Sequence, residues 1–164
     1  MPQPIGVAGG KDAVYYHIKA SGTGTTISFF NTNEGASGEV VTNLPTTNQL
    51  NRNFEVRKLV IQPSSDLARA DLLKLVEGAV VKLVVNKDEV IKMPLIMALS
   101  DFSFSTEGTV DTGEVISTSQ RSKGYEFENP VTIPANTFFE VKIVLESGLG
   151  TDTDMVCYIA GVER

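Results

Sequence analysis

The sequence predicts an all-β fold, an antiparallel β-sandwich of the jelly-roll type with one short helix. Three observations support this prediction: apolar and polar residues alternate with a period of two in many short segments, turn-forming residues separate these segments, and only one stretch has helical spacing. Alternation with a period of two indicates strands with one buried face. About eight or nine strands at turn-punctuated spacing are typical of a sandwich or jelly roll. A chain of 164 residues, 41% of them hydrophobic, is long enough for one domain with a sizeable core.

The start of the chain differs from the rest in composition. Residues 1–24 contain five glycines and two prolines. This composition predicts a flexible N-terminal arm that is free or becomes ordered against a neighbour. Within the arm, residues 14–18 (VYYHI) have enough β-propensity for a short pairing segment. Residues 25–164 are predicted to form a single β-sandwich domain.

The first two strands of this domain are predicted at residues 25–31 and 54–62. In the second strand the apolar residues change parity near Arg57 and Lys58. This change indicates either a β-bulge or a later half of the strand that is buried on both faces. The connection between the two strands, residues 32–53, is polar and rich in turn residues. Connections of this length usually carry function or contact a partner.

One helix is predicted, directly after Pro63. Its expected N-cap is Ser64 or Ser65, and Asp66 lies in its first turn. Gly78 follows its end. Its apolar face is predicted to consist of Leu67, Leu72, Leu75 and Val76.

A hairpin is predicted after the helix. Its strands are residues 79–85 and 89–99, and residues 86–88 form the turn. Pro94 lies in the return strand, and a proline fits an edge strand or a bulge better than a central strand.

The next part of the chain is mostly polar. Phe102 and Phe104 begin a short predicted strand, whereas residues 105–123 are predicted to form a loop with one weak strand at residues 114–117. The final strand, residues 155–162, is apolar on both parities. It is therefore expected in the interior of the sandwich.

The stretch YEFENPVTIPANTFFEVKIVLE, residues 125–146, keeps its apolar residues on odd positions on both sides of a turn that begins with a proline. It predicts two half-buried strands joined at residues 134–137. Because the phase is the same on both sides, the turn is expected to return the chain within one sheet system.

The charge and the rare reactive residues argue against several function classes. A net charge of −6 and a pI of about 4.8 oppose the attraction to phosphate on which nucleic-acid binding depends. Arg52, Arg57 and Lys58 are interpreted as a solvated strand face. His17 is the only histidine, which leaves no cluster for a metal site and no evident nucleophile–base pair. We interpret it as a surface or packing histidine, and the single Cys157 as a buried, inert thiol.

Acidic residues offer the one alternative that involves catalysis. Glu126 and Glu128 share a strand face, as do Glu140 and Glu146, and some sandwich folds cleave polysaccharides with facing carboxylates. An acidic solvent face is the favoured interpretation, because half-buried strands normally place charges outside.

Asp152 and Asp154 have the spacing of the first ligands of a calcium loop, but the rest of that motif is missing. A plain turn is therefore predicted here. The sequence as a whole predicts a protein that is not an enzyme, with no catalytic, cofactor-binding or metal-binding residues.

Three segments carry a resemblance to a known family. They are NPVTIPANTFFEVKIVLE, with two strands around a proline turn, FEVRKLVIQPSSDLARADLLKLVEGAVVKLVVNKDEVI, with a strand, a short helix and a hairpin, and the closing strand MVCYIAGVER. Together they cover about half of the chain and resemble the single jelly-roll capsid proteins of tailless icosahedral, membrane-containing bacteriophages and archaeal viruses.

The resemblance implies a structural virion protein, a major, minor or penton-type capsid or coat subunit that assembles through its arm and loops. The segments expected to do this are residues 1–24 and 32–53, followed by 105–123. The expected partners are copies of itself and other capsid subunits, together with an internal membrane or a membrane-associated virion protein. Neither direct nucleic-acid binding nor a small-molecule substrate is expected.

Such a protein would be made soluble in the host cytoplasm and would end in the virion. The alternative hypothesis is a non-catalytic carbohydrate- or receptor-binding module. A sandwich glycosidase that uses the acidic face is a third.

Overall fold

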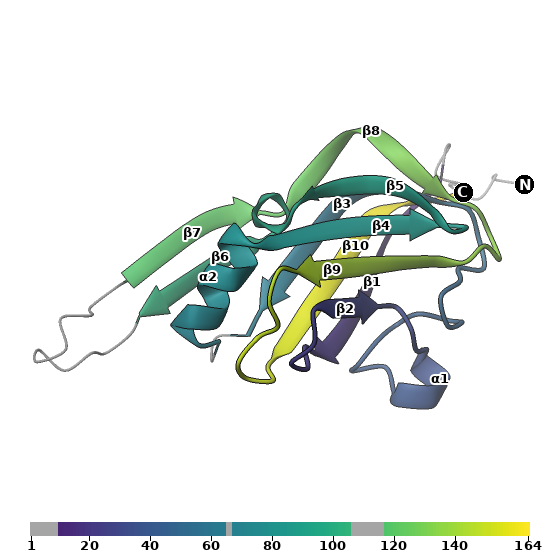
Figure 1. The fold of residues 1–164 in the computed structure, drawn as a ribbon. Helices are drawn as coiled ribbons and strands as arrows, with labels where there is room; N and C mark the ends of the chain where they lie inside the picture. The colour runs from purple at the N-terminus through teal and green to yellow at the C-terminus, as the bar shows by residue number, and fades with distance from the viewer. Residues whose placement is uncertain (1–9, 65–66, 106–116) are drawn as a thin grey trace, which may run out of the picture.

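The strands form two four-stranded antiparallel sheets and a separate two-stranded ribbon (Figure 1). The computed structural model describes residues 10–64, 67–105 and 117–164. Sheet A has the order β1 (Lys11–Ala20), β10 (Asp154–Glu163), β3 (Phe54–Pro63) and β8 (Tyr125–Ile133). Sheet B has the order β2 (Thr26–Phe29), β9 (Phe139–Leu145), β4 (Ala79–Val85) and β5 (Asp88–Pro94). The ribbon pairs β6 (Ser100–Ser105) with β7 (Ser117–Lys123).

The strand pairing is nested, and this nesting defines the topology. The first strand of the sandwich pairs with the last, β1 with β10, and the next pairs inward are β2 with β9, β3 with β8 and β4 with β5. A chain folded back on itself in this way and wrapped into two sheets is a jelly roll. The prediction of an all-β, jelly-roll sandwich is confirmed. The ribbon is inserted between β5 and β8.

The inner faces of the two sheets form one core. Along β9, buried and half-buried residues alternate without interruption, with Phe139, Val141, Ile143 and Leu145 inside. This pattern agrees with the predicted parity. On β10, Met155, Cys157 and Ile159 face the core. The residues between them are half-buried on the outer face, so β10 is a central strand with a single core face.

The prediction that residues 1–24 form a flexible arm is wrong for residues 11–20. Residues Lys11–Ala20 form β1, and all ten pair with β10. The glycines lie before and after this strand, and Tyr15 and His17 alternate inward with partners at Ile159 and Cys157. The pairing segment expected at residues 14–18 is confirmed, but the strand is longer than expected because the glycine-rich composition concealed its ends. Residues 1–9 lie outside the described residues.

A β-bulge at Arg57 explains the change of parity in β3. Pairing with β10 and with β8 moves from Val56 to Lys58 and omits Arg57 on both sides. Gly161 lies opposite the bulge, where an added Cβ would be 1.8 Å from the carbonyl oxygen of Glu55. Of the two predicted explanations the bulge is confirmed, and the close approach of backbones requires glycine at this position.

The turn at residues 134–137 connects the two sheets, which corrects the expectation of a return within one sheet system. β8 pairs with β3 in sheet A, and β9 pairs with β2 and β4 in sheet B. The same parity faces inward in both strands because the two sheets approach one core from opposite sides. Asn136 has a positive φ of 55° in this turn, a conformation that asparagine tolerates.

The helix and the hairpin after it agree with the sequence in type and differ at their ends. The helix α2 (Arg69–Glu77) begins after Ala68, which makes no side-chain cap, so the predicted N-cap at Ser64 is wrong. The alternative cap Ser65, and Asp66, lie outside the described residues. Gly78 follows the helix as predicted.

In the hairpin, Asn86 and Lys87 form the turn, both with positive φ. The return strand β5 ends at Pro94, at the edge of sheet B, and the chain continues as the 3-10 helix η1 (Leu95–Met97). The predicted strand to residue 99 is therefore too long.

Two further elements were not expected. A one-turn helix, α1 (Glu34–Ser37), lies within the polar connection and is capped by the side chain of Asn33. Residues 117–123, predicted as loop, form β7 and pair with β6. A strand without apolar residues shows no alternation of apolar and polar residues, so the sequence pattern does not reveal it. Residues 106–116, which include most of the predicted weak strand, lie outside the described residues.

Candidate functional site: interaction surfaces

The only histidine lies inside the sandwich. His17 is 3% exposed on the inner face of β1, and its ring packs edge-on against Phe29. Its Nδ1 accepts the backbone N–H of Phe30 at 2.8 Å. Burial, and secondarily the charge of Lys19, lowers the pKa of His17 to about 4. His17 is therefore a neutral core residue, which confirms the packing interpretation and rules out a surface position.

Cys157 lies directly opposite His17 in the β1–β10 ladder and is fully buried. Burial raises the pKa of its thiol well above the usual value. A thiol that stays protonated is a poor nucleophile, so the prediction of a buried, inert cysteine agrees with its environment.

The acidic residues do not form one groove. Glu126 and Glu128 lie on β8 in sheet A, whereas Glu140 lies on β9 in sheet B. The Glu126 carboxylate is 3.9 Å from the ammonium of Lys58, and that of Glu140 is 2.9 Å from Lys142. Each strand therefore carries its own exposed or partly exposed ion pair on a different sheet.

Of the two aspartates near the C-terminus, Asp152 stabilises a turn, as predicted, whereas Asp154 begins β10. Asp152 accepts the backbone N–H of Gly22 at 2.8 Å, which ties together the turns that follow β1 and β9. Within the described ranges, no three His, Cys, Asp or Glu side chains lie close enough together to hold a metal ion.

Asp71 is a structural residue that the sequence did not reveal. It is 2% exposed on α2 and accepts the backbone N–H groups of Gly150 at 2.7 Å and Thr151 at 3.1 Å. Lys74 lies 3.6 Å from its carboxylate. Asp71 thus anchors the β9–β10 turn to the helix. The sequence signal for this role was an aspartate next to Leu72, on the apolar side of the predicted helix.

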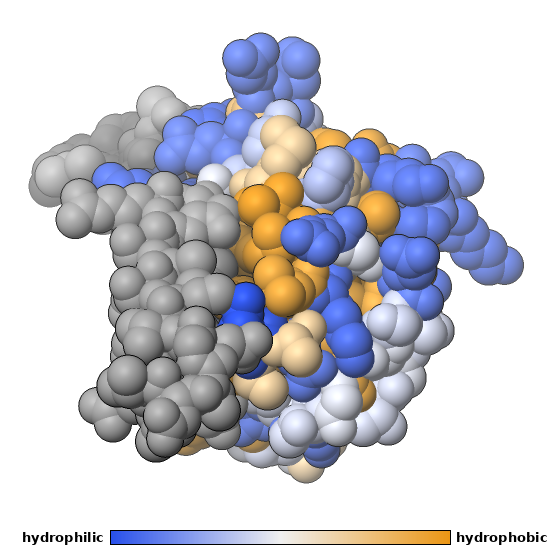
Figure 2. All heavy atoms as spheres, turned by 60° about the vertical axis from the view of Figure 1, so that its left-hand side comes forward, coloured by the Kyte–Doolittle hydropathy of each residue, from blue (hydrophilic) through white to orange (hydrophobic). Residues whose placement is uncertain are grey.

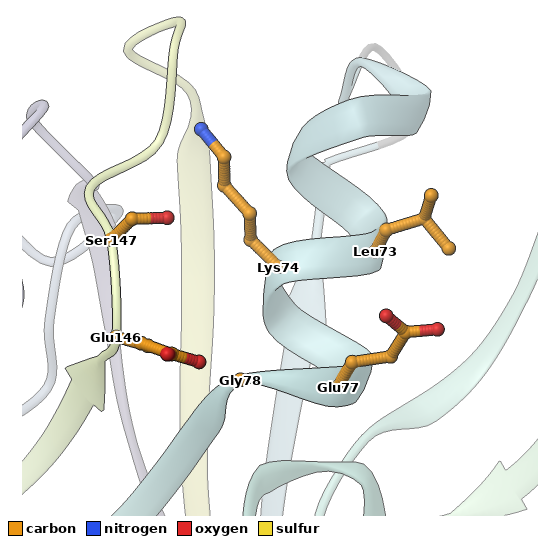
Figure 3. Close-up of a pocket in the computed structure, with 6 residues that line it drawn as sticks. All are labelled: Leu73, Lys74, Glu77, Gly78, Glu146 and Ser147. Carbon is orange, nitrogen blue, oxygen red and sulfur yellow. The ribbon is translucent and has the colours of Figure 1, made fainter.

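A pocket of about 370 Å³ lies between α2 and the end of β9 (Figure 3). It is lined by Leu73, Lys74, Glu77, Gly78, Glu146 and Ser147. The side chain of Lys74 points along the pocket to the β9–β10 turn, where it donates to the carbonyl oxygen of Gly148 at 2.8 Å. Glu77 and Glu146 lie on either side of Gly78, so two carboxylates line this end of the pocket.

Exposed apolar side chains lie on the same side of the molecule, on α2 and on η1, which pack together. Leu73 is 44% exposed and Met97 is 45% exposed, and Val76 and Ile96 are partly buried beside the core. We call these four residues the α2–η1 surface. Figure 2 shows an apolar area in the middle of the face that is turned forward. Because η1 leads into β6, this surface lies near the base of the ribbon.

The outer face of sheet A is also apolar. Val14 is half-exposed, and Tyr16, Val60, Val156 and Tyr158 are partly exposed on neighbouring strands. A depression of about 350 Å³ lies at the Arg57 bulge, and Val14, Arg57, Lys58 and Ala160 are among its lining residues. Arg52 and Arg57 are exposed and Lys58 is partly exposed, in agreement with the predicted solvated strand face. Arg57 pairs with Glu55 and Lys58 with Glu126.

The long polar connection, residues 32–53, covers part of the sandwich. Its residues 39–43 lie along the free edge of β1, and Leu44 and Leu50 are buried in the core. We call residues 32–53 the strap and residues 39–43 the edge cover.

No helix within the described residues is long and apolar enough to cross a membrane. Comparison with protein-family models, with curated proteins and with solved structures found no match to the chain.

Proposed function

We propose that the protein is a structural subunit of a virion, a capsid or coat protein that assembles with copies of itself. The observation that carries the proposal is the β6–β7 ribbon, which projects from the jelly-roll sandwich (Figure 1). A sheet of only two strands is marginally stable in water and gains stability when it packs against another surface. A projecting ribbon therefore fits a protein whose neighbours complete its structure.

The apolar surfaces support this proposal. The α2–η1 surface lies near the base of the ribbon, and the outer face of sheet A offers a second apolar region. Apolar surface of this kind on a sandwich is a feature of subunits that are covered by neighbours. With two different surfaces on one chain, the first surface of one copy can contact the second surface of the next copy. Contacts of this kind build rings and shells.

The test compares the solution mass of the full chain with that of a variant without the ribbon. Ser100 and Lys123 face each other in the β6–β7 ladder, so a two-residue Asn-Gly turn can join them in place of residues 101–122. We expect the full chain to form a defined oligomer or larger particle in sedimentation over a range of concentrations, and the shortened chain to remain a monomer.

A second variant, Met97→Ser on the α2–η1 surface, tests the neighbouring apolar area without touching the ribbon. We expect it to weaken association by about fivefold or more, because a large apolar contact at a central position of an interface contributes about 1 kcal/mol or more. A full chain that remains a monomer at the highest concentrations reached would overturn the proposal.

The pocket beside α2 supports a second candidate function, a non-catalytic carbohydrate- or receptor-binding module. Its volume of about 370 Å³ is within the range of small-ligand sites. Glycan-array binding that is lost in Glu146→Gln, with the oligomeric state unchanged, would favour this candidate over the virion subunit.

A further inference from the structure

A buried histidine, a strained phenylalanine and a covered strand edge meet at one place in the fold. His17 lies on β1, Phe30 directly follows β2, and the edge cover lies along the free side of β1. The bond from the Phe30 N–H to Nδ1 of His17 needs a neutral imidazole. The edge cover bonds the backbone on both sides of His17, at Tyr16 and Ile18.

Phe30 is held in an unfavourable backbone conformation. Its φ is +67°, in the left-handed region that bulky residues rarely adopt, although its side chain is completely buried. Its N–H donates to Nδ1 of His17, and its carbonyl accepts the N–H of Asn48 at 2.9 Å. Its ring packs 5.3 Å from that of Phe139. Such a conformation persists only where the surroundings hold it.

The edge cover occupies the hydrogen-bonding groups that β1 leaves free on the side away from β10. Ile18 donates its N–H to the carbonyl of Val41 at 2.8 Å, and the side chain of Asn43 bonds both Tyr16 N–H and the carbonyl of Val14. Thr42 pairs with His17 as an isolated bridge. Two further bonds link the cover to Tyr16, from the Thr42 hydroxyl to its carbonyl and from its own hydroxyl to the carbonyl of Glu39.

We propose that His17 makes the edge cover sensitive to acid: when its ring takes up a proton, residues 39–43 separate from β1 and the edge of the sheet opens. A protonated imidazole has donors on both nitrogens, so Nδ1 no longer accepts the N–H of Phe30. The new charge lies in the core, and the charge is stabilised only when water reaches the ring. Thr42 lies beside His17, so separation of the cover is the shortest route for water.

The groups around His17 favour this response. Lys19, two residues along β1, is the charged group that acts on the ring, and its ammonium donates to the carbonyl of Ser28. Cys157, across the ladder on β10, stays protonated in acid. Phe29 and Phe30 contribute no charge, and in the strap Glu34 and Glu39 are exposed. Nothing described next to the ring supplies a carboxylate that would stabilise the imidazolium in place.

Opening would expose a row of unpaired backbone groups. The free edge of a strand is a template on which a strand from another chain can add. The response would therefore make one edge of sheet A available for pairing only in acid.

Amide hydrogen exchange of the full chain tests the proposal directly. The reporters are the amides of Ile18 and Tyr16, which donate to the edge cover. The pKa of His17 is about 4 in the folded chain and 6.5 when free. These two values predict that the protection of both amides falls by about twentyfold between pH 7 and pH 5, after correction for the intrinsic rate. Amides between β4 and β9 serve as internal references and should change much less.

His17→Asn is the matched variant. The amide oxygen of asparagine lies near the position of Nδ1, so it can accept the Phe30 N–H, but it does not titrate. We expect its Ile18 amide to show nearly the same protection at both pH values. Glu39→Gln removes the exposed carboxylate of the cover, and we expect the loss of protection to persist in this variant.

Two results would overturn the proposal. One is an equal loss of protection in the wild type and in His17→Asn. The other is measured on the wild type: by NMR, the His17 imidazole titrates near pH 6.5 while the Ile18 amide stays protected from exchange. This result does not depend on whether His17→Asn folds.

Discussion

Two long polar connections join strands of the sandwich, and they fold in different ways. The strap lies against the domain, buries Leu44 and Leu50, and bonds its backbone to β1 and β9. The connection from residue 100 to residue 123 pairs with itself as β6 and β7 and projects from the sandwich (Figure 1). In the strap, burial of Leu44 and Leu50 makes a polar connection part of the core. By this reasoning the strap serves stability and the ribbon is available to a partner.

The largest effect should come from removing an apolar residue of the strap. Leu50→Ala deletes a side chain that is 1% exposed, and the cavity left behind should lower the free energy of unfolding by about 2–5 kcal/mol. Urea denaturation measures it. Val40→Ala, in the same strap, is the matched control because Val40 is 80% exposed, and its effect should stay within about 0.5 kcal/mol. Similar effects of the two substitutions would mean that the strap is not part of the core.

Acid should weaken the domain through His17, the buried histidine of β1 that the edge cover lies beside. Because the folded pKa of His17, about 4, is below its unfolded value of 6.5, the stabilisation is complete above pH 6.5 and is lost as the pH falls toward 4. The loss should reach about 3 kcal/mol. Urea denaturation from pH 7 to pH 4 measures it. The hydrogen bond from Arg57 lowers the pKa of Glu55, which adds a loss in the same direction.

The His17→Asn variant separates these two contributions. It retains the Glu55 effect and loses the histidine effect, so its stability should depend less on pH over this interval. Identical pH dependence in the two proteins would place the acid sensitivity elsewhere.

The sequence predicted the jelly-roll class and the inward parity of β9 because burial on one face of a strand leaves a direct trace in the order of residues. It did not predict that β8 and β9 belong to different sheets, because parity alone does not say which sheet a strand joins. Only residues 14–18 of β1 were expected to pair, because the neighbouring glycines hid the full length of the strand. β7 was missed because it lacks apolar residues.

Two local features outside the strap were equally hidden. A positive φ at Phe30 and a buried Asp71 follow from contacts between residues far apart in the chain, which a single sequence does not reveal. The interaction surfaces were expected in the arm and loops. Val76 was assigned to the apolar face of the helix and residues 96 and 97 to a strand, whereas Leu73 was not assigned.

A smaller effect is expected from the polar contacts of the strap. Asn43→Ala removes the side chain that bonds Tyr16 N–H and the carbonyl of Val14, at 2.9 Å and 2.7 Å. Net hydrogen-bond contributions suggest a loss of about 1–2 kcal/mol in urea denaturation. The exposed Asn51 provides the same substitution as a control, and Asn51→Ala should be close to neutral. If both substitutions are neutral, the edge cover adds little to the folded state and its apolar neighbours hold the strap alone.

The smallest effect on stability should come from deleting the ribbon. Replacing residues 101–122 by Asn-Gly removes the ribbon but keeps the bond from Ile61 N–H to the carbonyl of Ala98, which anchors the base of the ribbon to β3. The β6–β7 ladder is internal to the ribbon, so the free energy of unfolding should change by less than about 1 kcal/mol, the size expected away from the core. Thermal and urea unfolding of the shortened chain measure it. A loss comparable to that of Leu50→Ala would make the ribbon a part of the core and end the contrast with the strap, whereas preserved stability with lost self-association would assign the ribbon to contacts between subunits.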